Sequence, residues 1–262
     1  MEAKNINNNY TFDKLTAKKN AKDFVENIMN IEKKSNIKNE FNIEYEKKIP
    51  LYNMHTLVLE NDEVKVELDN KGEPIVYRNK LKTPLDKIIS TNKKLNKEDL
   101  QTKATNVADG FGKEKKILIG IEEMFNGYMS YKWARTYDGY NYDLDFVSVT
   151  LDTYTGDIIL ASKMYVSNEP QNKIKLDESA ALKIAIKETN KFIDCKIGDL
   201  LSNNILIVNP NYKWSENATS DLVKGTRLAY AFTFRLKEPY EGELTLWIDA
   251  ENGSFLGGTN TK

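Results

Sequence analysis

One pattern occurs three times in this sequence and constrains its fold more than any other feature. In each copy, an alternating apolar segment is followed by an aspartate, a short polar turn, a glycine and a second apolar segment. The alternating segments are 64–68, 147–151 and 244–248, and the turn residues are Asp69 and Gly72, Asp152 and Gly156, and Asp249 and Gly253. Apolar residues at every second position are typical of a strand with one buried face. The sequence therefore predicts three β-hairpins.

The aspartate and the glycine of each turn have a structural role in this interpretation. An aspartate accepts hydrogen bonds from backbone amides two positions further on, and glycine adopts the positive φ that closes such a turn. A calcium loop is the alternative. The turns at Asp152 and Asp249 supply too few oxygen ligands to bind calcium. They also lack a glutamate at the position where a calcium loop has its bidentate ligand. We therefore expect structural turns.

A helical pattern precedes each hairpin. The first covers about 16–33, where apolar residues recur with helical spacing. The second follows Asn96, a typical N-cap residue, and ends at Gly110. The third follows Asp177, and its expected buried side carries Leu182, Ile186 and Ile193, with Ala181, Ala185 and Phe192 beside them.

Strand patterns lie between each helix and its hairpin, so that one helix and four strands form a repeated unit. The division that follows is a frayed N-terminus at 1–12, a first and incomplete unit at 13–83, a second at 84–169 and a third at 170–262. Pro84 and Pro170 fall in the polar connections. In the second unit, apolar residues alternate in one phase up to Phe146 and in the other from Val147, which predicts a β-bulge there.

Composition excludes several classes of protein. The 262 residues include 38 basic and 39 acidic side chains, so a broad nucleic-acid-binding face is not expected. His55 and Cys195 are the only histidine and cysteine, which excludes zinc sites of the Cys/His kind and an intrachain disulfide. Nucleophile-elbow glycines that would match His55 are absent, and Cys195 is expected to be a small buried residue. We predict no catalytic residue, cofactor or metal.

Membrane and export signals are also missing from the chain as given. Its apolar stretches are shorter than a membrane span, and its first residues lack the charged-then-apolar order of a secretory signal. A cytoplasmic protein and an exported protein without its leader both remain open.

The segment 131–142 is the candidate binding surface. Exposed tyrosine, tryptophan and arginine are the residue types that dominate binding hot spots, and they are concentrated here. The candidate residues are Tyr131, Trp133, Arg135, Tyr137, Tyr140 and Tyr142. In the alternative interpretation, Trp133 covers the hydrophobic layer under the second helix and Arg135 pairs with a neighbouring acid.

Two motifs resemble a known family. The helix opening Leu176-Asp177-Glu178-Ser179-Ala180, followed by a sheet ending in apolar-x-apolar-Asp-x-x-x-Gly-x-apolar, resembles the PepSY domain. The threefold arrangement with Trp133-Ala134-Arg135 resembles the YcdB/YcdC-type repeated domain of Gram-positive bacteria, over about residues 13–262. The first unit departs from the pattern, because its turn is one residue shorter. The resemblance implies an α+β fold of tandem PepSY-like units, each a helix on a curved antiparallel sheet, located outside the cytoplasm or at the cell envelope and without catalytic residues.

Two classes of function remain open at this point. The first is a non-enzymatic binding or regulatory protein of the cell envelope, such as a peptidase inhibitor or modulator, whose sheet edges pair with a protein or peptide partner. The second is an enzyme that works with carboxylates alone, such as a glycosidase. It would use two of Asp138, Asp143, Asp145 and Glu122 or Glu123. Acidic residues at alternating strand positions are normally the solvated face, which favours the first class.

Overall fold

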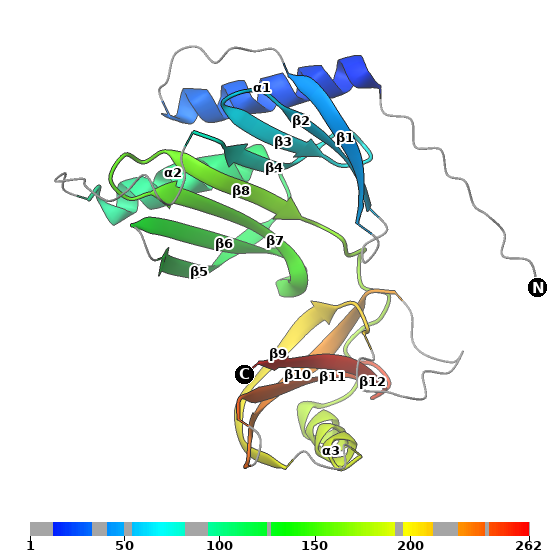
Figure 1. Ribbon diagram of the computed structural model, residues 1–262. Coiled ribbons are helices and arrows are strands. Elements are labelled where there is room, and N and C mark those ends of the chain that lie inside the picture. The colour runs from blue at the N-terminus through cyan, green and yellow to red at the C-terminus, as the bar shows by residue number, and fades with distance from the viewer. Residues whose placement is uncertain are drawn as a thin grey trace, which may run out of the picture. The chain divides into compact units, whose positions relative to one another are not determined.

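The computed structural model describes residues 13–32, 41–49, 54–81, 94–124, 127–191, 196–211, 225–238 and 241–261 (Figure 1). The expected frayed segment 1–12, Pro84 and Cys195 lie outside these residues. The elements are α1 (Lys14–Glu32), β1 (Asn42–Ile49), β2 (Met54–Glu60), β3 (Val64–Leu68), β4 (Pro74–Asn79), α2 (Lys97–Gly110), β5 (Lys116–Met124), β6 (Tyr128–Tyr137), β7 (Tyr140–Asp152), β8 (Ile158–Met164), α3 (Glu178–Thr189), β9 (Ile197–Val208), β10 (Arg227–Leu236), β11 (Glu243–Asp249) and β12 (Phe255–Thr261).

The α+β class is confirmed. Within the described ranges the chain forms three helices and twelve strands, and most strand pairs are antiparallel. The helices begin where their capping residues predict. Asn96 Oδ1 accepts a hydrogen bond from Glu98 N at 3.0 Å, and Asp177 Oδ1 accepts one from Ala180 N at 3.0 Å. Each bond satisfies an amide that has no partner within the first turn of its helix.

The chain divides into two compact units, and each contains parts of β6 and β7. Unit 1 comprises residues 1–114, 118–133 and 146–164, and unit 2 comprises residues 115–117, 134–145 and 165–262. The boundaries expected at 83/84 and 169/170 stay predictions.

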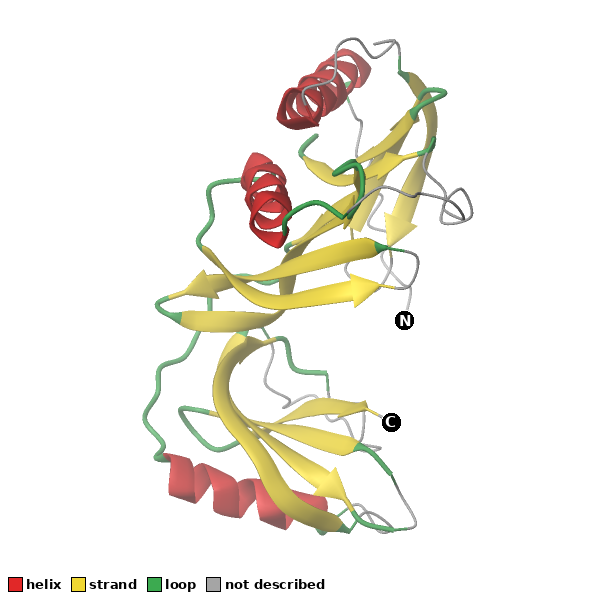
Figure 2. Cartoon of the chain, turned by 90° about the vertical axis from the view of Figure 1, so that its left-hand side faces the viewer, coloured by secondary structure: helices red, strands yellow, loops and turns green. Residues whose placement is uncertain are grey.

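In unit 1, two helices cover one face of a sheet. The strand order is β1-β2-β3-β4-β8-β7, with β6 beside β7 and β5 beside β6. Helix α1 contacts β2, β3 and β4, while α2 contacts α1 and β8 (Figure 2). The rings of Phe24 on α1 and Phe111 after α2 lie 4.9 Å apart, between centroids. The apolar stripe of each helix is thus buried against the sheet.

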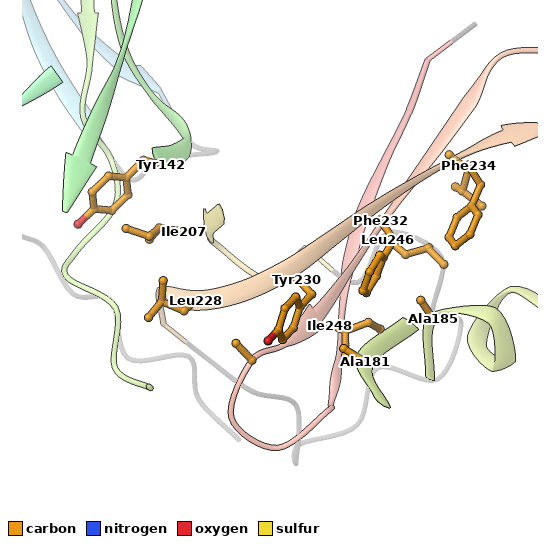
Figure 3. Packing of buried hydrophobic residues seen from close by; sticks show 12 residues of the cluster. Tyr142, Ala181, Ala185, Ile207, Leu228, Tyr230, Phe232, Phe234, Leu246 and Ile248 are labelled. Atoms are coloured by element: carbon orange, nitrogen blue, oxygen red, sulfur yellow. The ribbon is translucent and has the colours of Figure 1, made fainter. Parts of the chain in front are cut away.

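In unit 2, one helix covers an antiparallel sheet of order β9-β10-β11-β12. Helix α3 contacts β10 and β11. In Figure 3, Ala181 and Ala185 of α3 face large apolar residues of the sheet, among them Phe232 and Ile248. The first residues of β7 add a short parallel pair to β9, at Asn141 with Leu206 and Tyr142 with Ile207.

The buried side of α3 differs from the expected one. Ala181, Ala185 and Thr189 are buried, whereas Ile186 is 42% exposed. Small alanines allow the helix to approach a sheet face that already carries large side chains. The expected position of Ile193 lies outside the described residues.

The predicted bulge at Phe146–Val147 is wrong for the pairing of β7 with β8. Phe146 pairs with Met164 and Val147 with Lys163, and the register is continuous at this point. The buried face of β7 changes earlier, because Tyr142 and Asp145 are both buried although they are three residues apart. Asp145 is held inward by partners that the strand pattern does not reveal.

Crossing a membrane requires a long apolar helix, and no helix in the described part of the chain meets that requirement.

Candidate functional site

A tight hairpin connects β6 and β7 in the middle of the candidate binding surface. Its two turn residues, Asp138 and Gly139, have φ values of 48° and 84°. Positive φ at both positions belongs to the type I′ turn, whose twist matches that of the two strands, and Asp-Gly is a preferred sequence for it. The turn brings Tyr137 and Tyr140 to the end of the hairpin.

The six candidate residues differ in accessibility. Tyr131 and Trp133 are buried in unit 1, where their rings stack with centroids 6.1 Å apart. Tyr142 is buried in unit 2, whereas Arg135, Tyr137 and Tyr140 are half-buried there. The binding role of the six stays a prediction, and the last three are the ones that a ligand could reach.

Arg135 lies at the centre of a charged and aromatic cluster in unit 2. Its Nη1 donates to Asp145 Oδ2 at 2.8 Å and to the carbonyl oxygen of Ser167 at 2.9 Å. The guanidinium also lies 4.4 Å from the ring centroid of Tyr142 and 5.3 Å from that of Tyr165. A guanidinium in this position gains both an ion pair and cation–π contacts.

Asp145 is fully buried and well supplied with donors. Besides Arg135, it accepts hydrogen bonds from Val166 N at 3.0 Å, Ser167 N at 3.1 Å and Ser167 Oγ at 2.8 Å. Ser167 Oγ in turn accepts a bond from Asn209 Nδ2 at 2.8 Å. These bonds and the ion pair with Arg135 fix the carboxylate of Asp145 in one position. Asp145 therefore anchors this part of β7 to the segment at Val166 and Ser167.

Glu123 is one of the carboxylates that were weighed for a glycosidase. Glu123 forms an ion pair with Lys94, and the hydrogen bond and charge of that lysine lower the pKa of the Glu123 carboxyl. A general acid of a glycosidase needs a raised pKa. The carboxyls of Asp13, Asp177 and Glu251 likewise have lowered pKa values.

The three Asp-to-Gly turns share one hydrogen-bond geometry. The aspartate carboxylate accepts from the amide two positions on, at 2.8 Å in each turn. The glycine amide donates to the carbonyl oxygen of the same aspartate at 2.8–3.0 Å. The glycine φ values are 79°, 70° and 77°, in chain order. The repeated sequence pattern thus forms these two bonds in every turn, although the glycine comes three residues after the aspartate in the first turn and four in the others.

A helix residue lies over the glycine of every turn. Asn20 Nδ2 of α1 donates to Gly72 O at 2.9 Å, and Lys103 Nζ of α2 donates to Gly156 O at 2.8 Å. In unit 2 the contact is apolar, because Ile184 of α3 approaches the position that a side chain on Gly253 would occupy. Each helix is therefore fixed to the hairpin that follows it in the sequence.

The third turn has an additional charged partner. Asp249 is fully buried, and its Oδ2 accepts from Arg227 Nε at 2.7 Å. Asn172 Nδ2 donates to Asp249 Oδ1 at 3.2 Å and to Leu228 O at 2.9 Å. The sequence pattern identified Asp249 but gave no signal for Arg227 or Asn172, which come from distant segments.

Strand β9 provides an open sheet edge in unit 2. It pairs with β10 along its length, from Ile197 to Val208. On its other side it pairs with β7 at two residues only, Leu206 and Ile207, among the strands that the structure describes. Leu200 and Leu201 on the open part are 41% and 39% exposed. The strand pattern in the sequence gives no sign that this side of β9 stays open.

Metal chemistry has no evident site in the described ranges. There, no three side chains of His, Cys, Asp or Glu gather in a way that could hold an ion. His55 is half-buried on β2, opposite Lys48 of β1.

Comparison with known proteins gives a likeness to solved structures only. No protein-family model matches this chain, and no curated protein matches it. Among solved structures, it is similar to the Bacillus megaterium YpeB C-terminal domain, with 14% sequence identity and a TM-score of 0.49. The match covers 96% of this chain and 98% of that chain. At this level of similarity no residue role is carried over.

Proposed function

We propose that this protein is a non-enzymatic binding or regulatory module of the cell envelope, which captures an extended segment of a protein or peptide partner. The observation that carries the proposal is the open edge of β9 between Ile197 and Ile205. An unpaired strand edge offers a row of amide and carbonyl groups to an incoming strand.

The neighbourhood of the β9 edge suits an extended peptide. The parallel pair with β7 stops at Asn141, where the chain turns back through the hairpin of Tyr137 and Tyr140. A peptide strand would therefore continue the ladder along β9 from the point where β7 leaves it. Leu200 and Leu201 supply apolar contacts, and the half-buried tyrosines supply flat rings with a polar end.

The fold of this module is proposed to consist of tandem PepSY-like units. The support is the recurrence of one arrangement: a helix, the strands that follow it and an Asp-to-Gly turn whose glycine contacts that helix. The location outside the cytoplasm rests on the PepSY resemblance of the sequence. A peptidase that is inhibited or modulated by the module is the partner that this resemblance favours.

The test is a pull-down from a Gram-positive envelope extract with wild-type protein and with the variant Leu200→Lys/Leu201→Lys. Two lysines on the open edge oppose the docking of another strand. We expect the wild type to retain a partner at micromolar concentration and the variant to bind it at least about tenfold more weakly. Leu160→Lys, which changes a similarly exposed leucine on β8, is the control and should bind normally.

Hydrogen exchange locates the contact. Amides of residues 197–205 should become protected when the recovered partner is added. Failure to recover any partner, or equal binding by the β9 variant and the wild type, would contradict the proposal.

A further inference from the structure

Strand β5 is a second open edge, and it is unusually apolar. Among the described strands it pairs only with β6. Ile117, Ile119 and Ile121 alternate along it and are 52%, 49% and 52% exposed. Three half-exposed isoleucines on one side of an edge strand form a surface that natural proteins usually pair, cover or charge.

The charges around this apolar row are arranged with opposite signs at its two ends. Lys115 and Lys116 come directly before Ile117, whereas Glu122 and Glu123 come directly after Ile121. Counted outwards from Ile119, each lysine has a glutamate at the same distance on the other side. The strand is therefore complementary to a second copy of itself in the antiparallel direction.

We propose that two copies of this chain form a dimer through antiparallel pairing of their β5 strands, centred on Ile119. In that register, Ile119 lies opposite Ile119 of the second copy and Ile117 lies opposite Ile121. Lys116 lies opposite Glu122, and this pair occurs twice because the arrangement has twofold symmetry. Apolar and opposite-charge cross-strand pairs both stabilise a sheet, and a twofold interface uses the same patch on both copies.

The charge pattern favours a second copy over an unrelated peptide. A peptide of another sequence matches Glu122 and Lys116 only if it carries lysine and glutamate at the same spacing, whereas a second copy of β5 always does. Glu123 forms an ion pair with Lys94 of its own chain. Lys116 and Glu122 lie next to the isoleucine row, and in this arrangement they set the register between copies. One strand pair makes a small interface, and the dimer is expected to dissociate in the micromolar range.

The first experiment measures mass in solution by sedimentation equilibrium between about 1 and about 200 µM, which covers the dissociation range of small interfaces. The wild type should change from monomer to dimer over this range. Ile119→Lys should stay monomeric, because the symmetry places two like charges directly opposite each other. Leu15→Lys is the matched control, since Leu15 on α1 is 83% exposed and should not affect the dimer.

A charge exchange tests the register. Lys116→Glu and Glu122→Lys should each weaken the dimer, because each places like charges opposite one another at both ends of the interface. The two variants should form a mixed dimer with each other, and the double variant Lys116→Glu/Glu122→Lys should recover self-association. A peptide-binding edge without self-pairing would show none of this recovery.

Cysteine cross-linking locates the twofold axis. In a Cys195→Ser background, Ile119→Cys should form a disulfide-linked dimer, because directly opposite residues are close enough for that bond. Ile117→Cys alone should not, since its two copies would be separated by four residues, about 13 Å along the strand. A mixture of Ile117→Cys with Ile121→Cys should link. A wild-type protein that stays monomeric at the highest concentration, or a dimer that Ile119→Lys leaves intact, would overturn the proposal.

Discussion

Replacing the aspartate of the third turn should destabilise this protein far more than the same change in the first turn. The two turns share the hydrogen bond from the amide two positions after the aspartate, but they differ in what surrounds the carboxylate. Asp69 is half-exposed and accepts from Lys71 N at 2.8 Å and Glu73 N at 2.9 Å. Asp249 is fully buried beside Arg227.

The expected magnitudes follow from these surroundings. In Asp69→Ala, water can reach the two amides, so the loss resembles that of a helix cap, about 1 kcal/mol. In Asp249→Ala, the guanidinium of Arg227 loses a buried partner, and removing one member of a buried pair costs about 3–5 kcal/mol. Arg227 Nη2 keeps a contact of 3.3 Å to Glu251 Oε2, so we expect about 3 kcal/mol, the lower end of that range.

The assay is equilibrium unfolding in urea, combined with peptide-resolved hydrogen exchange so that each unit reports its own stability. Asp69→Ala should lower protection slightly in unit 1, and Asp249→Ala should lower it strongly in unit 2. In a double-mutant cycle, Arg227→Met with Asp249→Ala should destabilise less than the sum of the single changes, by about 2 kcal/mol.

Equal losses of about 1 kcal/mol in both turns would refute this reasoning, because they would show that the turn alone sets the value of its aspartate. A cycle in which the two changes simply add would refute it as well.

Two further predictions concern glycine and tyrosine. Gly253→Ala should lower the free energy of unfolding in urea more than Gly139→Ala does. Both glycines have positive φ, which costs about 1–2 kcal/mol for alanine. Only at Gly253 would the new methyl group also lie 2.7 Å from Ile184 Cδ1. Burial, and then the charge of Glu32, raise the pKa of Tyr77 well above its usual range. The folded protein thus keeps this proton to a higher pH than the unfolded chain, so the stability that Tyr77 contributes is complete below about pH 10 and is lost as the pH rises further. Tyr77→Phe should therefore lose less stability than the wild type between about pH 8 and pH 11, and parallel pH profiles would contradict this.

Local structure in this protein is largely determined by the sequence itself. The start of α2 at Asn96 and of α3 at Asp177 follows from capping, which needs only an oxygen acceptor within a few residues of the orphan amides. The turns at Asp152 and Asp249 follow from the same short-range chemistry. Such features depend on residues within about four positions, so a pattern can identify them.

The surroundings of these elements were decided by tertiary structure. Alternation predicted a bulge at Phe146–Val147, but the face of β7 changes earlier, where Arg135 and the segment at Ser167 hold Asp145 inward. Helix α3 buries its alanines because the sheet beneath it supplies the bulk. Neither partner is adjacent in the sequence, so the spacing of apolar residues carries no information about it.

The open edges of β5 and β9 also combine a local feature that the sequence shows with surroundings that it does not show. The segments 117–121 of β5 and 205–208 of β9 are visible in the sequence as short apolar runs, which are typical of a strand. Whether such a strand is central or at an edge depends on which other strands pair with it, and hydrogen bonds between distant segments set that order. The sequence by itself determined that strands and turns form and where the capped helices begin. The tertiary structure alone decided which strands keep an unpaired side, because backbone pairing does not depend on side-chain identity and leaves little trace in the pattern of residues.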